Sequence, residues 1–154
     1  MGVPETMGDE ESKCFTLAEA ERTRVECEPI LVEAIDARRK MVEFEDKLRA
    51  ISERILRSGG MQVPYDQAAK WRNNHDRFAE QVGAALERIQ STGCLVKDLD
   101  VGLLDFPARL NNEEIYFCWR LGEDRIRFYH RQDEGFSGRK PLDPRDKDHQ
   151  LPTQ

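Results

Sequence analysis

The chain has 154 residues, of which 38% are hydrophobic and 35% charged, and its net charge is −6. This length suits one ordinary domain, and the acidic balance without a basic stripe argues against nucleic acid as a partner. No apolar run is long enough for a membrane span and no signal-like N-terminus is present, so we expect a cytoplasmic protein with no membrane partner. The scattered cysteines, with no C-x-x-C pair, predict free thiols: Cys14, Cys27, Cys94 and Cys118.

The first ordered element follows an acidic arm, residues 1–14, that we expect to be disordered. Thr16 and Glu19 have the spacing of a capping box, in which each side chain accepts a hydrogen bond from the other residue's backbone N–H. A helix is therefore predicted over about 16–28. Pro29 lacks an N–H and either kinks this helix or opens a new one, predicted over 30–58.

Two long segments carry heptad seams, with apolar residues spaced alternately by three and four. The second helix is predicted over 65–92 and is closed by Gly93. The matched lengths and the short Gly-containing connection predict an antiparallel, coiled-coil-like helical hairpin. The first seam comprises Ile30, Ala34, Ala37, Met41, Phe44, Leu48, Ile51 and Ile55, and the second Ala68, Trp71, His75, Phe78, Val82, Ala85 and Ile89.

From Cys94 the apolar period changes from helical to two, which is typical of strands. Strands are predicted over about 94–97, 103–109, 114–120 and 125–130, with Asn111-Asn112 as a two-residue hairpin turn. The predicted fold class is α+β, a long antiparallel helical hairpin followed by a small antiparallel β-meander, in a single domain over 15–142 with a loose tail over 143–154. The face expected to be buried carries Leu104, Phe106, Ala108, Ile115, Phe117, Trp119, Ile126 and Phe128.

Several strings of residues together carry a family resemblance: Phe15 to Ala20 with Pro29, Gly93 to Asp100, Gly102 to Pro107, Cys118 to Glu123, and Gly135 to Arg139 with Pro141. On these strings the chain resembles a bacterial domain-of-unknown-function family, DUF2203, over nearly all of its ordered length. Tyr129 stands where a Trp is expected in many relatives, which keeps an aromatic side chain. The resemblance implies membership of an uncharacterised family and assigns no catalytic residue.

Polar side chains crowd into the last third of the chain and form the candidate ligand-binding cluster: Asp98, Asp100, Asp105, Arg120, Arg127, His130 and Arg139. The expected register places Asp105, Cys118 and Arg127 in one row on the outward face. Such a row is either a reactive thiol beside an arginine or an ordinary cross-strand ion pair. We favour the ion pair.

The metal and phosphate alternatives are weaker. Asp98 and Asp100 could ligate Mg²⁺ with Asp105, but Asp is also a common turn residue because it bonds its own backbone. The segment 135–141 could wrap a phosphate through backbone N–H groups, or could fold back with Phe136 in the core. We therefore predict no metal site and no cofactor, and leave the catalytic residues unknown.

Two function hypotheses follow from these patterns. The first is a non-catalytic interaction or regulatory module that self-associates as a homodimer through the hairpin, because Leu31, Ile35, Val42 and Leu56 widen the apolar stripe. A further protein partner is compatible with it. The alternative is a small enzyme, or an anionic-ligand or metal-binding protein, with a site built on the β-meander.

Overall fold

The computed structural model describes residues 13–59 and 65–142, so most of the predicted arm and all of the predicted tail lie outside the described residues. Two compact units are present: unit 1 comprises Met1–Pro29 and Ile89–Gln154, and unit 2 comprises Ile30–Arg88. Among the described helices, none combines the length and apolar character that crossing a membrane requires. The elements in chain order are α1 (Leu17–Ser58), α2 (Tyr65–Gln90), β1 (Leu95–Asp98), β2 (Leu103–Leu110), β3 (Glu113–Arg120), β4 (Phe128–Arg131), a 3₁₀ turn (Phe136–Gly138) and β5 (Lys140–Pro141).

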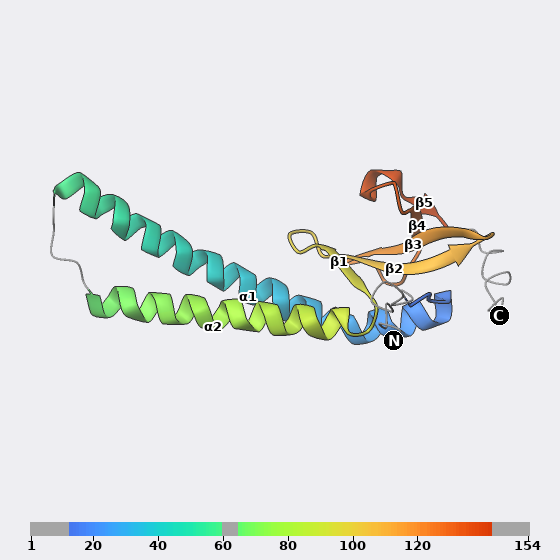
Figure 1. Cartoon of the computed structure of the whole chain (residues 1–154), viewed down its shortest axis with the longest axis horizontal. Coiled ribbons are helices and arrows are strands. Elements are labelled where there is room, and N and C mark those ends of the chain that lie inside the picture. The colour runs from blue at the N-terminus through green and yellow to red at the C-terminus, as the bar shows by residue number, and fades with distance from the viewer. Residues whose placement is uncertain (1–12, 60–64, 143–154) are drawn as a thin grey trace, which may run out of the picture. The chain divides into compact units, whose positions relative to one another are not determined.

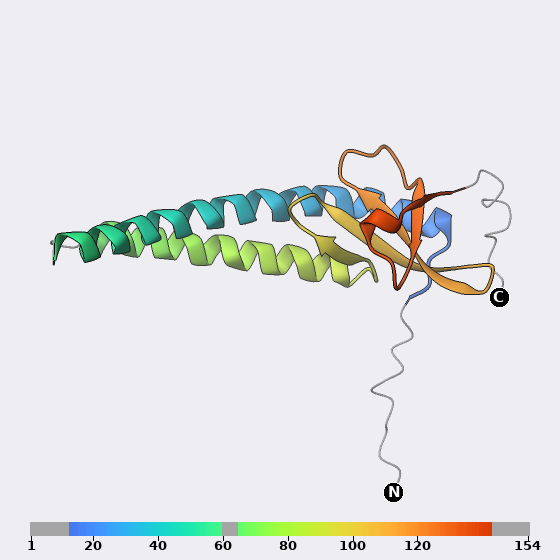
Figure 2. The ribbon, with the colours of Figure 1, turned by 90° about the horizontal axis from the view of Figure 1, so that it is seen from above.

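Unit 2 is the predicted helical hairpin, in which α1 and α2 lie side by side (Figures 1 and 2). Phe44 and Phe78, one from each seam, stack with ring centroids 6.0 Å apart. His75, in the second seam, lies within hydrogen-bond distance of Glu45 on the other helix, at 3.0 Å. The heptad pattern therefore identified both the helices and their contact face.

The start of α1 forms the predicted capping box. Thr16 N–H donates to Glu19 Oε1 and Glu19 N–H donates to Thr16 Oγ1, each at 3.1 Å. The predicted break at Pro29 is wrong, because α1 continues through it. A proline inside a helix removes one backbone hydrogen bond, but Cys27 and Leu31 on either side of it are fully buried, and their packing outweighs that loss.

Unit 1 holds an antiparallel five-stranded meander in the order β1-β2-β3-β4-β5. The β2–β3 turn has positive φ at Asn111 (52°) and Asn112 (66°), as predicted for a two-residue hairpin. The inner face of the sheet is the one that carries the core, and the predicted β2–β3 register is confirmed. Its pairs are Leu104 with Trp119, Phe106 with Phe117, and Ala108 with Ile115.

The inner face packs on the segment that opens α1 (Figure 1). The ring of Phe15 meets that of Phe106 edge-on, with centroids 5.4 Å apart, and Phe15 N–H donates to Pro107 O at 2.7 Å. The Arg24 guanidinium lies 5.5 Å from the centre of the Trp119 ring. The rings of Phe15, Phe106 and Trp119 are all fully or almost fully buried.

The fourth strand, predicted over 125–130, is observed at Phe128–Arg131. The Ile126 N–H donates to Glu21 Oε1 on α1 at 3.1 Å. The backbone before β4 is thus bonded to a helix side chain rather than to β3, and β4 begins at Phe128, three residues later than predicted.

This delay changes the register of β4. Phe128 pairs with Cys118, and His130 pairs with Tyr116. The expectation that Phe128 shares the inner face with Phe117 is therefore wrong. Both Phe128 and His130 lie on the opposite, outer face of the sheet, since alternate residues of a strand point to opposite sides.

The segment after β4 returns along the sheet. The short strand β5 pairs with β4 through Phe128 opposite Pro141 and Tyr129 opposite Lys140, a strand that the sequence did not predict. The segment thus folds back, but Phe136 is 41% exposed, so its predicted place in the core is wrong.

Candidate functional site

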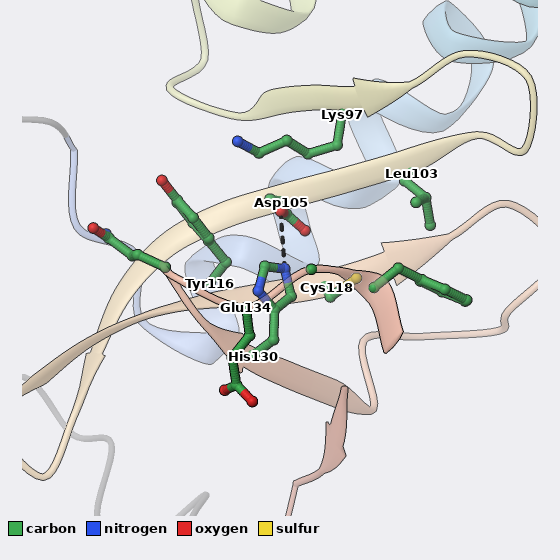
Figure 3. Close-up of a pocket in the computed structure, with 10 residues that line it drawn as sticks. Lys97, Leu103, Asp105, Tyr116, Cys118, His130 and Glu134 are labelled. Atoms are coloured by element: carbon green, nitrogen blue, oxygen red, sulfur yellow. Dashed lines mark hydrogen bonds and ion pairs between the residues drawn. The ribbon is translucent and has the colours of Figure 1, made fainter. Parts of the chain in front are cut away.

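Three neighbouring strands each contribute one chemically reactive side chain to the outer face. Asp105 on β2 pairs in register with Cys118 on β3, and His130 follows on β4. All three are buried, with 2%, 1% and 4% exposure respectively. Asp105 Oδ2 lies 3.0 Å from His130 Nε2, and one ligand atom from each of the three residues falls within 4.8 Å of the others (Figure 3).

A cavity of about 180 Å³ opens beside these residues. We call it the sheet cavity. The Tyr116 ring lies 5.5 Å from that of His130, and Lys97 Nζ lies 5.0 Å from the centre of the Tyr116 ring. The cavity is lined by Asp105, Cys118 and His130 together with Lys97, Leu103, Tyr116, Gln132, Glu134, Gly135 and Phe136 (Figure 3).

The Asp105 carboxyl is buried, and keeping it ionised there costs free energy. Burial raises its pKa, and the neighbouring His130, a side-chain hydrogen bond with Cys118 and the charge of Lys97 only partly oppose that rise. Its Oδ1 atom is buried and has no hydrogen-bond partner among the described residues. His130 Nδ1 lies 2.8 Å from the Arg131 carbonyl oxygen, which can only accept, so Nδ1 carries a proton and Nε2 faces Asp105.

Cys118 lacks the surroundings of a nucleophilic cysteine. Burial, reinforced by the charge of Asp105, raises its pKa to about 12. Both ring nitrogens of His130 are already engaged, by Arg131 and by Asp105. Because a catalytic cysteine needs a lowered pKa or an adjacent base, this arrangement does not support a reactive thiolate.

Arg139 fixes the strand backbone next to the site. One of its terminal nitrogens donates to Glu123 Oε1 at 2.7 Å and to the Cys118 carbonyl at 3.3 Å. Its guanidinium lies 4.1 Å from the centre of the Phe128 ring. It does not line the sheet cavity.

The structure divides the seven predicted cluster residues into two groups. Asp105 and His130 line the sheet cavity, and Arg139 donates to the Cys118 carbonyl next to it. The other four lie outside the cavity lining: Asp98, Asp100, Arg120 and Arg127.

These outer residues have local roles that explain their positions. Asp98 Oδ1 accepts from the backbone N–H of Asp100 at 2.7 Å, which is the turn role weighed against metal binding. Arg127 pairs with Asp124 at 2.9 Å, and not with Asp105 as the predicted row required. The guanidinium of Arg120 lies 5.9 Å from the centre of the Phe136 ring.

Sequence reasoning missed the cavity walls. Lys97, Tyr116 and Glu134 were not in the predicted cluster, and Cys118 was considered only as a partner of an arginine. The period-two pattern places Tyr116 and Cys118 on the face of Asp105, so that signal was available. Glu134 lies in a turn after β4, where no periodicity operates.

The fold and the site define a small α+β protein, a helical hairpin with an antiparallel sheet, that carries a buried Asp-Cys-His group beside a cavity. The chain belongs to the family DUF2203, described as an uncharacterized conserved protein, whose model matches residues 13–142. No curated protein and no solved structure matches the chain significantly.

Proposed function

We propose that this protein binds a small ligand in the sheet cavity. The observation that carries the proposal is Asp105 Oδ1, a buried acceptor without a partner among the described residues, on a side chain that lines the cavity. Leaving a buried acceptor unsatisfied costs about 1–3 kcal/mol. A ligand that brings a hydrogen-bond donor or a positive charge to this oxygen would offset that cost.

The chemistry of the cavity favours some ligands over others. The Asp105 carboxylate in the cavity lining repels anions, so the anionic ligand considered from the sequence is the less favoured class. Lys97 and Glu134 at the walls carry opposite charges and can orient a polar molecule. The rise in the pKa of the buried Cys118 thiol disfavours covalent thiol chemistry in the ligand-free protein.

The test is a thermal-unfolding screen of the untagged chain against small amines, neutral polar compounds and divalent metal ions. Compounds that bind should raise the melting temperature of the wild type and not that of Asp105→Asn. Asp133→Asn, a change of the same kind at an exposed position, serves as the matched control and should respond like the wild type. If every compound stabilises wild type and Asp105→Asn equally, the proposal is wrong.

A second candidate function, self-association through the hairpin, is favoured by the incomplete burial of unit 2. From Met41 to Ile55 the apolar seam residues of α1 are only half-buried, and so are Trp71, Phe78 and Val82 on α2. Val42 is 38% exposed beside this seam. Two helices cannot enclose such a seam, whereas two hairpins packed as a four-helix bundle can, so we propose a second copy of this chain as the partner.

The dimer is tested by light scattering coupled to gel filtration. Val42→Lys should convert a dimer to a monomer, whereas Met41→Lys should weaken the hairpin itself. Glu43→Lys, at an exposed neighbouring position, controls for the added charge. A wild-type monomer at high micromolar concentration would rule the dimer out.

We also infer a cytoplasmic location. All four cysteines are free thiols, and Cys14 is exposed. Free thiols persist in reducing compartments. Cell fractionation checks this inference, and recovery of the protein in an oxidising compartment would contradict it.

A further inference from the structure

We propose that the ligand of the sheet cavity is a divalent transition-metal ion of the zinc type, held by Asp105, Cys118 and His130. The inference rests on the proposed function, because it names the chemical class of ligand for the same site. It reverses our expectation from the sequence that no metal site is present.

The spacing of the three side chains fits a single ion. Their ligand atoms lie within 4.8 Å of one another, and Asp105 Oδ2 and His130 Nε2 are 3.0 Å apart. Ligand atoms of a tetrahedral zinc lie roughly 3.5 Å apart, given bonds of about 2.0–2.3 Å. Small rotamer adjustments would bring all three atoms onto one ion.

The donor set selects the class of metal. Thiolate and imidazole are ligands of zinc and related transition metals, whereas magnesium and calcium require oxygen ligands. Only Asp105 offers an oxygen, so the hard cations are disfavoured. The sequence separation of the three residues, 105, 118 and 130, shows why no short ligand motif was visible: each lies on a different strand.

The groups around the ligands are arranged as metal sites require. A metal-bound histidine commonly donates its second ring N–H to a carbonyl or carboxylate, which fixes the ring and presents the other nitrogen to the ion. His130 Nδ1 makes this contact with the Arg131 carbonyl at 2.8 Å. Arg139 donates to the Cys118 carbonyl and so helps to fix the β3 backbone at the second ligand.

Charge balance permits an ion at this depth. Metal binding releases the proton of the thiol that it engages. A divalent ion bound by the resulting thiolate, one carboxylate and one neutral imidazole forms a neutral group. Burying it therefore avoids the large desolvation cost of an isolated charge. The ion would also satisfy Asp105 as an acceptor, which the described residues do not do for Oδ1.

Three protein ligands leave one position of a tetrahedron for another molecule. In zinc proteins, structural sites are closed by four protein ligands, whereas an open fourth position is typical of sites that bind water or substrate. All three residues line the sheet cavity. The bound ion would thus present its fourth position to the cavity, between the walls that carry Lys97 and Glu134 (Figure 3).

The test uses the untagged full chain, stripped with a chelator and kept reduced. Zinc is titrated in competition with a chromophoric chelator, and cobalt is added separately as a spectroscopic probe. We expect one zinc per chain, and a cobalt spectrum with a thiolate charge-transfer band and the visible bands of tetrahedral coordination. Cys118→Ser should abolish the charge-transfer band, and Cys118→Ser and Asp105→Asn should each weaken zinc binding by roughly 100-fold or more, since even outer contacts are worth about 10–100-fold.

Cys27→Ser is the matched control, because Cys27 is equally buried in unit 1 but is not one of the three ligands. It should leave both the affinity and the cobalt spectrum unchanged. Absence of zinc binding, or binding that survives Cys118→Ser, would overturn the metal assignment. If zinc fails to bind while an organic compound still stabilises wild type and not Asp105→Asn, the metal assignment fails and the proposed function stands. If neither binds, both fail.

Discussion

Replacing Asp105 by Asn separates a binding role for this residue from a purely structural one. If the Asp105–His130 contact were a structural ion pair, removing one buried charge would destabilise the protein by about 3–5 kcal/mol. The geometry leads us to expect a much smaller change in the ligand-free protein. The substitution removes a carboxyl whose pKa is raised by burial and keeps its shape.

The expected magnitude follows from two opposing effects. The loss of a charge-assisted hydrogen bond costs about 1.5–3 kcal/mol. Removing a buried carboxylate with one unsatisfied oxygen returns about 1–3 kcal/mol. In the variant, a His130 ring that keeps only its Nδ1 proton, against the Arg131 carbonyl, can accept a hydrogen bond at Nε2 from the Asn amide. The net change in the free energy of unfolding should be within about 1 kcal/mol.

The assay is urea unfolding at neutral pH in the presence of a chelator. Trp119 is fully buried on β3 and reports on unit 1, and Trp71→Phe removes the other tryptophan. Asp133→Asn is the control and should change the unfolding free energy by no more than about 0.5 kcal/mol. A destabilisation of Asp105→Asn above about 3 kcal/mol would refute the reasoning and identify the pair as a structural ion pair.

Two further predictions concern local structure. Gly93→Ala should destabilise the protein more than Gly122→Ala in urea unfolding. Both glycines have positive φ, 94° and 106°, so both substitutions strain the backbone. Of the two, only Gly93 would also place the added Cβ 3.0 Å from a side-chain carbon. Equal effects would show that backbone strain alone decides both. Hydrogen bonds with Asp76 and Glu45 raise the pKa of His75 in the folded protein. The protonated form therefore stabilises the hairpin, fully at a pH below the pKa of His75 in the unfolded chain, about 6.5. This contribution is lost as the pH rises through the higher pKa of the folded state. Circular dichroism melts across this range should show a decline that His75→Asn removes, and an unchanged slope in the variant would contradict it.

The helices could be predicted well because their signals are repetitive. The heptad seams repeat the helical spacing over many residues, and the capping box at Thr16 independently marks where α1 begins. The continuity of α1 through Pro29 could not be read in this way. It depends on the burial of residues on both sides of the proline, which is a tertiary effect that outweighs a local preference.

The sheet was predicted up to the point where its alternation breaks. The β2–β3 register follows from the Asn111-Asn112 turn and the apolar pattern. The segment before β4 is held by contacts with α1, about a hundred residues earlier in the chain: the Ile126 N–H donates to Glu21, and Arg24 donates to the Asp124 carbonyl. In the observed register His130 lies on the face of Asp105, and because the contacts that accompany this register are so distant in sequence, the central pair of the site was not predictable from local sequence. Asp105 and His130 were both named as candidates, but as members of a looser cluster.

The two outermost strands of the sheet have a consequence for how this protein avoids unwanted association. An exposed strand edge is a template on which another chain can add a strand and start aggregation, and natural sheets protect such edges with short strands, lysine and proline. Here β1 has four residues and carries an exposed Lys97, and β5 consists only of Lys140 and Pro141. Proline offers no N–H to an incoming strand. Both borders of the meander are therefore poor templates, which protects the protein against edge-to-edge aggregation at high concentration.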